Sequence, residues 1–373
     1  MSSSHEPRNV PERSYPLISV VIPTYNVAEY LADCLESITR QDFHHIEIIA
    51  IDGASEDASV AILNDIGKGE PRLAIHPREK IGPGRARNEG AELATGEYVW
   101  FVDADDLVVA DCLTFIAKRI EAVRPDVLFI DYQALYPNGR LRPGDRHDLM
   151  GREVPECFTL AEQPWVIDLN MASWNKVIRR EFLRSVPAFW PYSPHEDIET
   201  SYSLLMEADK LSILNHVCYV YRKHRSGSEM ESGRSNRHFN IFYPYEMLLD
   251  QIEKRGSDDG RAITPEIRQA LFQRAIGHYA SIFDAGGLGS DRSARRLIAH
   301  GDRRRFFARM HQDYLRYAPS GYQRPHGFRG IKFRLIEKNA YKKYSALEPL
   351  NKIRVWAVRF TRGVRRPLWR LKR

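Results

Sequence analysis

Residues 17–130 alternate between short apolar runs and longer segments with apolar residues on one face. The runs are rich in β-branched and aromatic residues, which predicts buried strands at 17–22, 46–51, 73–75, 97–102 and 127–130. The segments between them repeat apolar residues every three or four positions, which predicts helices at 28–40, 57–66, 85–95 and 110–123. This alternation indicates an α/β fold with a mostly parallel sheet flanked by helices.

The pattern changes after residue 130. Proline, glycine and charge are frequent in 137–160, which predicts a loop or a small excursion, and ordered patterns resume at 174–178, 197–207 and 211–221. Helices are then expected at 241–254, 264–283 and 291–317, followed by a linker at 321–330. We therefore expect a flexible N-terminus at 1–16, an α/β domain at 17–235 with halves 17–130 and 131–235, a helical region at 236–320, and a linker and basic tail at 321–373.

Three carboxylates follow the apolar run that ends at Val102, namely Asp103, Asp105 and Asp106. Open α/β sheets bind ligands at the C-terminal ends of their strands. Hard oxygen ligands at such a point suit Mg²⁺ or Mn²⁺ and a phosphate-bearing substrate. Taken alone, the same residues could equally form a solvated acidic turn that caps the next helix.

The ends of two earlier predicted strands lie at the same edge of the sheet. Pro23, Thr24 and Tyr25 end the first strand, and Asp52 ends the second. A strand-end carboxylate can accept hydrogen bonds from a base or a ribose, and an aromatic ring can stack on a base. The alternative is helix capping by the segment around Asp52, with Ser55 or Asp57 as the cap.

The glycine-rich segment 82–90 does not match a dinucleotide-binding loop. Arg87 stands where the third glycine of G-x-G-x-x-G is required, and no G-x-x-x-x-G-K-[ST] motif occurs in the chain. These observations disfavour a Rossmann dehydrogenase and a P-loop NTPase. An arginine near a helix start can still bind a phosphate or a base.

Four motifs occur in order in the first half: S-V-V-I-P-T-Y-N at 19–26, D-G-x-S-x-D at 52–57, A-R-N-x-G at 86–90 and G-E-Y-V-x-F-V-D-A-D-D at 96–106. Together they resemble the family 2 glycosyltransferases, which have the GT-A fold. The resemblance is close over about 17–130 and continues more loosely through N-K at 175–176, H-E-D at 195–197 and Y-R-K-H-R-S-G-S at 221–228.

This resemblance implies an inverting, metal-dependent transfer of a sugar from a nucleotide-sugar donor, with 17–130 as the donor half and 131–235 as the acceptor half. It implies that Asp103-Ala104-Asp105 is the family's D-x-D motif, with Asp105 on the metal and Asp103 on the donor ribose or sugar. Asp52 and Arg87 are then expected on the base side of the donor, and Pro23, Thr24 and Tyr25 line the same pocket. Gly53 stands where many members have a second aspartate.

Transfer to a hydroxyl also requires a base, because the acceptor oxygen is a poor nucleophile until its proton is removed. Asp197 matches the family's E-D motif and is the candidate base, and Glu196 is expected to support it or to orient the acceptor. The alternative for Asp197 is a carboxylate that interacts with a helix dipole. His224 matches a position where relatives place a metal or phosphate ligand. Arg222 and Ser228 could help to close a loop over the diphosphate.

Charge is unevenly distributed along the chain. Residues 290–373 contain 24 Lys and Arg against 5 Asp and Glu, whereas residues 1–289 contain 31 against 44. Residues 350–364 place apolar side chains on one helical face and cations on much of the remainder, which is typical of an interfacial helix on anionic lipid. Packing on the protein's own domain and nucleic-acid binding are the alternatives, and we expect no nucleic-acid partner.

Four separated cysteines without C-x-x-C predict free thiols, and no signal peptide or membrane span is expected. We therefore expect a cytoplasmic enzyme, peripheral at the inner face of the plasma membrane through 330–373. Its expected partners are a UDP-sugar donor and a cell-envelope polysaccharide or lipid-linked glycan acceptor, with Mg²⁺ or Mn²⁺ as cofactor. Two other functions fit the sequence: a metal-dependent nucleotidyltransferase, and an inactive GT-A-like scaffold that binds a membrane or polyanion.

Overall fold

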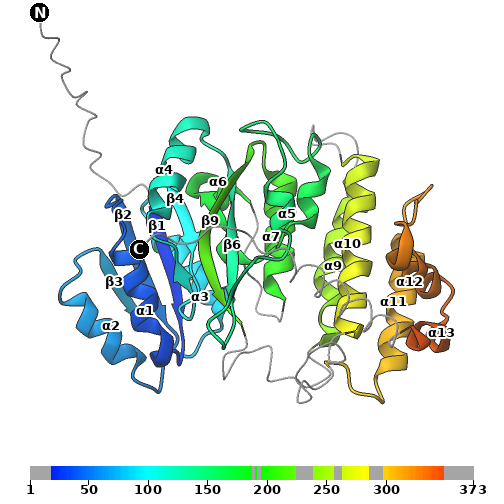
Figure 1. Cartoon of the computed structure of the whole chain (residues 1–373), viewed down its shortest axis with the longest axis horizontal. Coiled ribbons are helices and arrows are strands. Elements are labelled where there is room, and N and C mark those ends of the chain that lie inside the picture. Colours follow the sequence, from blue (N-terminus) through cyan, green and yellow to red (C-terminus); the bar gives the residue numbers. More distant parts are fainter. Residues whose placement is uncertain are drawn as a thin grey trace, which may run out of the picture. The chain divides into compact units, whose positions relative to one another are not determined.

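The computed structural model describes residues 18–186, 190, 195–223, 238–255, 263–284 and 297–347. The chain divides into two compact units, Met1–Ser226 and Gly227–Arg373 (Figure 1). No helix in the described ranges is long and apolar enough to cross a membrane. The expected flexible N-terminus, His224, Ser228 and the amphipathic segment 350–364 lie outside the described residues.

One sheet forms the centre of the first unit, in the order β3-β2-β1-β4-β8-β6-β9-β5, with β7 paired to β6. The strands are β1 Ile18–Thr24, β2 Ile46–Asp52, β3 Leu73–Pro77, β4 Tyr98–Phe101, β5 Leu107–Val108, β6 Val127–Leu135, β7 Leu141–Pro143, β8 Lys176–Arg179 and β9 Leu211–Arg222. β1 to β4 pair in parallel, as do β6 and β9. β8 runs antiparallel to both β4 and β6 and joins the two halves of the sheet.

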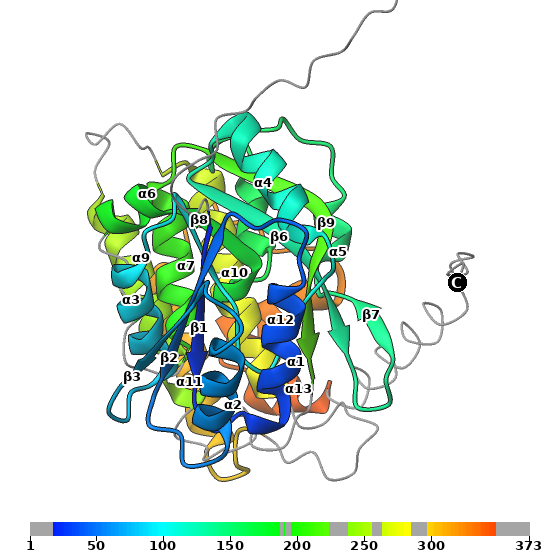
Figure 2. The same cartoon turned by 90° about the vertical axis from the view of Figure 1, so that its left-hand side faces the viewer.

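Helices cover both faces of this sheet (Figure 2). They are α1 Ala28–Thr39, α2 Ser59–Gly67, α3 Pro83–Leu93, α4 Cys112–Val123, α5 His147–Met150, α6 Arg180–Ser185 and α7 Glu196–Glu207, with short 3-10 turns η1 Pro164–Asp168 and η2 Ser173–Asn175. The apolar faces of α1 and α4 pack with alternate residues of β1, such as Val20. The intervening Val21 meets α3 at Gly90, where a Cβ atom would lie 2.2 Å from Val21 Cγ1. Glycine at this position therefore allows α3 to approach the sheet closely.

The second unit is helical in its described part, as the sequence predicts. Its helices are α9 Phe242–Lys254, α10 Pro265–Asp284, α11 Arg303–Tyr317, α12 Gly327–Glu337 and α13 Tyr341–Ala346. Edge-to-face contacts between aromatic rings fill its core, for example between Phe283 and Tyr344, whose centroids are 5.4 Å apart.

Several predicted boundaries were wrong. The segment 137–160, expected to be a loop or a small excursion, contains the short elements β7 and α5. Within the described residues, the helix expected at 291–317 begins at Arg303. Residues 297–302 are not helical, and Gly301 among them disfavours a helix. The linker expected at 321–330 ends earlier, since α12 begins at Gly327 and buries Phe333 and Ile336. All four cysteines are free thiols, as predicted.

Candidate active site

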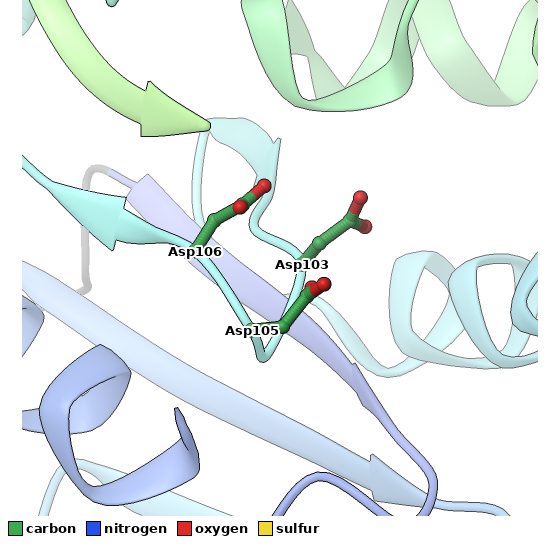
Figure 3. A group of neighbouring side chains, drawn as sticks. All are labelled: Asp103, Asp105 and Asp106. Atoms are coloured by element: carbon green, nitrogen blue, oxygen red, sulfur yellow. The ribbon is translucent and has the colours of Figure 1, made fainter. Parts of the chain in front are cut away.

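The three predicted carboxylates gather in the turn that follows β4. Ligand oxygens of Asp103, Asp105 and Asp106 all lie within 4.8 Å of one another (Figure 3). The turn is closed by a 3.0 Å hydrogen bond from the Asp106 N–H to the Asp103 carbonyl. Asp105 is 8% exposed and Asp106 is fully buried, so the negative charges are partly removed from water.

β9 holds this turn from the second half of the domain. The Tyr219 hydroxyl donates to Asp106 Oδ2 at 2.8 Å, and the Arg222 N–H donates to Asp106 Oδ1 at 2.7 Å. The Asp103 N–H in turn donates to Tyr219 Oη at 3.1 Å. The suggestion that Asp106 caps the following segment is therefore wrong, because both of its oxygens accept from β9.

The electrostatics of the cluster favour a cation. Burial, together with the charges of Asp105 and Asp103, raises the pKa of Asp106 well above its ordinary value. Burial and the same carboxylates raise the pKa of the nearby Cys34 and Tyr219. Several closely spaced carboxylate oxygens are the donor set that Mg²⁺ and Mn²⁺ prefer, and a divalent ion would relieve their mutual repulsion.

Arg87 connects this cluster to the predicted base. Its Nη2 donates to Asp103 Oδ1 at 2.9 Å, and its Nη1 donates to Glu196 Oε1 at 3.0 Å and lies 3.6 Å from Asp197 Oδ1. The guanidinium is buried, with its side chain 5% exposed. Burial alone would lower the pKa of Arg87, but the charges of the three carboxylates outweigh burial and raise it. Arg87 therefore stays charged and bridges the donor-side and acceptor-side motifs.

Asn88 and Trp190 form a second link between the same two regions. Asn88 Nδ2 donates to the Trp190 carbonyl, and the Trp190 N–H donates to Asn88 Oδ1, both at 3.0 Å. The Trp190 indole packs edge-on against Phe101 of β4, and its Nε1 donates to Asp197 Oδ1 at 3.3 Å. Asp197 is thus oriented by Trp190 and Arg87 at the start of α7.

Glu196 is the more buried of the two adjacent carboxylates, since its side chain is 16% exposed against 30% for Asp197. Burial and the neighbouring Asp197 charge raise the pKa of Glu196 to about 7, although Arg87 opposes the rise. His195, just before it, has a left-handed backbone with φ of 71°, a conformation that non-glycine residues rarely adopt. Glu196 and Asp197 therefore follow a residue with an unusual backbone conformation.

The predicted nucleobase pocket lies at the ends of β1 and β2. Asp52 is 2% exposed and accepts from Ser55 Oγ at 2.6 Å and from the Ser55 N–H at 3.1 Å. Asp57 accepts from the N–H groups of Ala28 and Ser59, both at 2.9 Å, so it caps the start of α1 as well as its own segment. The second motif therefore supplies both a buried strand-end carboxylate and a structural cap.

Tyr25 is the most exposed predicted member of this pocket. Its ring is 38% exposed, and the Lys80 ammonium lies 5.0 Å from the ring centroid. Thr24 is buried, with its hydroxyl 3.3 Å from the Ile22 carbonyl, and Pro23 is half-buried. An exposed ring beside a cation is suited to stack on a nucleobase.

The Arg222 side chain contacts α1. Its Nη2 donates to Asp33 Oδ2 of α1 at 2.9 Å, and its guanidinium carbon lies 5.4 Å from the Tyr30 ring centroid. Sequence reasoning gave no role to Asn88, Trp190 or Tyr219. Only Asn88 carried a signal, because it belongs to the A-R-N-x-G motif.

Residues 19–186 match the family model described as Glycosyl transferase family 2. The chain is 28% identical to glycosyltransferase GlyG of Streptococcus pneumoniae over 228 residues, which are 58% of this chain and 73% of GlyG. It is 30% identical over 220 residues to the poly(ribitol-phosphate) β-N-acetylglucosaminyltransferase TarS of Staphylococcus aureus, which are 57% of this chain and 37% of TarS.

A solved structure of S. aureus TarS 1–349 in complex with UDP-GlcNAc aligns with a TM-score of 0.68 at 21% identity. The alignment covers 89% of this chain and 90% of that chain. At this level of identity the likeness establishes a common fold, and it confirms the predicted α/β GT-A class with a helical C-terminal region.

Proposed function

We propose that the chain is a family 2 glycosyltransferase, since the model of that family matches residues 19–186, and that it transfers one sugar from a nucleotide-sugar to an acceptor hydroxyl with inversion at the anomeric carbon. The observation that carries the proposal is the arrangement around Arg87. One buried guanidinium joins Asp103, beside the candidate metal site, to Glu196 and lies 3.6 Å from Asp197, the candidate base. A donor site and an acceptor site next to each other are what direct group transfer requires.

The donor half is assigned to 17–130. In this proposal Tyr25 stacks on the base, Asp52 accepts hydrogen bonds from the nucleoside, and Asp103 contacts the ribose or sugar. The residues that line the same side of the pocket are Pro23, Thr24, Arg87 and Ala104. We propose a UDP-sugar as donor, since the TarS structure with the same fold contains UDP-GlcNAc.

Asp105 is proposed to hold Mg²⁺ or Mn²⁺, with Asp106 fixing the turn and His224 as a further candidate ligand. The ion would neutralise charge on the leaving diphosphate. The fit rests on the closely spaced carboxylate oxygens. Burial together with the charges of Asp105 and Asp103 also raises the pKa of Asp106.

Asp197 is proposed to act as the base. As the acceptor oxygen forms its bond to the anomeric carbon, the hydroxyl proton passes to an Asp197 carboxylate oxygen and the bond to the nucleoside diphosphate breaks on the opposite face. This direct displacement inverts the anomeric centre. Trp190 and Arg87 orient the carboxylate, and Glu196 holds Arg87 in place from the adjacent position.

We propose a glycan of the cell envelope, either a polysaccharide or a lipid-linked precursor, as acceptor. Two similar proteins are named for transfer to poly(ribitol phosphate), and they support this class. Residues 330–373 are proposed to bind the anionic inner face of the plasma membrane, where such acceptors are built, because their cations outnumber their acidic residues. If deletion of 348–373 leaves binding to anionic liposomes unchanged, the membrane role of that segment is wrong.

The enzymatic proposal is tested by incubating the full chain with Mn²⁺ and a panel of nucleotide-sugars, and measuring release of nucleoside diphosphate. We expect release from a UDP-sugar, and its loss in Asp105→Ala and Asp197→Asn. Asp65→Ala is the matched control, since Asp65 is 80% exposed and pairs with Lys68 at the surface. Absence of release from every donor contradicts the proposal. Pyrophosphate release from a nucleoside triphosphate would instead indicate a nucleotidyltransferase.

A further inference from the structure

Lys176 is a buried cation that the proposed reaction does not use. It begins β8 and is 1% exposed. Its Nζ donates to the Ala172 carbonyl at 2.5 Å and to Asn175 Oδ1 at 2.8 Å, and lies 5.6 Å from the Phe129 ring centroid. No carboxylate oxygen lies within 4.0 Å of this ammonium in the part of the chain that the structure describes. Burial of an ammonium with only neutral partners is costly, so a hydrophobic residue would be expected if the position served packing alone.

The groups that Lys176 contacts belong to one turn, residues 170–175. Asn175 Nδ2 donates to the Asn170 carbonyl at 2.7 Å and so closes this turn. The amide oxygen of Asn175, Oδ1, accepts the hydrogen bond from Lys176 Nζ. The ammonium therefore supplies hydrogen bonds to a carbonyl and an amide oxygen of this turn. Because Lys176 belongs to β8, these bonds connect the turn to the sheet.

The same turn holds α7. Ser201 Oγ donates to the Met171 carbonyl of this turn at 2.8 Å, and the Tyr202 hydroxyl donates at 3.3 Å to the Ile167 carbonyl of η1, which precedes the turn. Asp197 is the second residue of α7 and lies one helical turn before Ser201. A shift of the turn would therefore move the segment that carries the proposed base.

Charge provides a second connection. Burial lowers the pKa of Lys176 to about 7, and the attraction of Asp197 opposes this fall. Arg87 of α3 and the adjacent Glu196 are further charged groups that interact with Asp197. Lys176 is therefore charged mainly below pH 7, and its attraction for the Asp197 carboxylate weakens above pH 7.

We propose that Lys176 is a positioning residue for Asp197, because it fixes the 170–175 turn against α7 and presents a positive charge to the base from the sheet side. This role rests on the proposed function of Asp197. It differs from the role of Arg87, which reaches the carboxylates directly from α3.

The test compares Lys176→Met, which removes the ammonium and keeps most of the length of the side chain, with Gln41→Met as control. Gln41 is also buried, and its Nε2 donates to two carbonyls, of Ser37 and Val109, both at 2.9 Å, on the α1 side of the sheet. Three properties of the full chain are measured: amide hydrogen exchange, affinity for UDP with Mn²⁺, and the pH profile of UDP release from UDP-GlcNAc with water as acceptor.

For Lys176→Met we expect exchange at least about fivefold faster in 196–202 and in the 170–175 turn, with UDP affinity within about twofold of wild type. UDP release should fall by about tenfold or more at pH 6 and by less at pH 8, because Lys176 of the wild-type protein loses its charge between these two pH values. Gln41→Met should leave α7 exchange and the pH profile unchanged.

Wild-type exchange in 196–202 together with a wild-type pH profile overturns the proposal. Faster exchange throughout the first unit with loss of UDP binding also overturns it, because Lys176 would then serve the fold as a whole. If the wild-type protein releases no UDP from UDP-GlcNAc, the donor assignment fails separately. The exchange comparison still tests whether Lys176 fixes the 170–175 turn against α7.

Discussion

Asn88 and Trp190, which are 102 positions apart, exchange two hydrogen bonds of 3.0 Å each. The amide of Asn88 pairs with the backbone of Trp190 much as one strand residue pairs with another. Because Trp190 also donates to Asp197, the amide at position 88 helps to set the orientation of the proposed base from the donor half. One asparagine in α3 thus connects the two halves of the site.

Asn88→Ala should therefore reduce both stability and the rate of transfer. Loss of two hydrogen bonds costs about 1–3 kcal/mol of stability. A misplaced catalytic group can cost roughly a hundredfold in rate. Urea unfolding and initial rates of UDP release measure the two effects. Asn138→Ala, in an exposed turn where the side chain accepts one bond from the Arg140 N–H, is the control and should change neither. Equal rates for Asn88→Ala and wild type would show that Trp190 needs no such support.

The site divides into parts that sequence could and could not anticipate. The Asp103–Asp106 turn was predictable because a continuous apolar strand and its terminal carboxylates are adjacent in the chain. The partners of Arg87 were not, because Glu196 follows 109 residues later and only the packing of α3 beside the start of α7 brings them together. Tyr219 carries no local signal either, since a strand tyrosine usually serves the core. The start of α11 was missed because charge and apolar spacing continued the helical pattern across Gly301.

Arg87→Met should destabilise the first unit and abolish transfer. Removing one partner of a buried ion-pair network leaves the carboxylates uncompensated, at a cost of about 3–5 kcal/mol. The measurement is urea unfolding followed by tryptophan fluorescence at pH 8, together with UDP release. Arg85→Met, two positions earlier on α3, is the matched control, because Arg85 is 67% exposed and pairs only with Glu89. Wild-type stability of Arg87→Met would mean that the three carboxylates do not depend on the guanidinium.

Glu196 should make stability depend on pH between about 4.5 and 7. Its pKa is raised from 4.5 to about 7 by burial and by Asp197, so the folded state binds the proton more tightly than the unfolded state. The resulting stability is present below pH 4.5 and is lost as pH rises through 7. The shift corresponds to at most about 3 kcal/mol.

Glu196→Gln removes this titration. We expect the variant to gain stability relative to wild type between pH 5 and pH 8, measured as the difference in urea midpoint at each pH. Glu181→Gln is the control, since the Glu181 side chain is 87% exposed. A constant difference between Glu196→Gln and wild type across this range would refute the raised pKa.

Tyr219→Phe tests whether β9 supports the candidate metal site. The substitution removes the hydroxyl that donates to Asp106 Oδ2 and accepts from the Asp103 N–H, and it keeps the ring that stacks on Trp174 with centroids 4.5 Å apart. Loss of a group that orients metal ligands typically lowers metal affinity by about 10–100-fold. Calorimetric titration with Mn²⁺ in the presence of UDP should show a reduction in Mn²⁺ affinity of this order.

Tyr98→Phe provides the comparison for Tyr219→Phe, because Tyr98 is equally buried in the same sheet and its hydroxyl donates to the Pro125 carbonyl at 3.0 Å, outside the carboxylate turn. It should lose a comparable amount of stability while keeping Mn²⁺ affinity. The contrast matters because Asp106, fully buried and bound twice by β9, cannot swing outward without breaking both bonds. If both phenylalanine variants bind Mn²⁺ like wild type, the backbone N–H of Arg222 alone holds the turn, and the cation site does not depend on Tyr219.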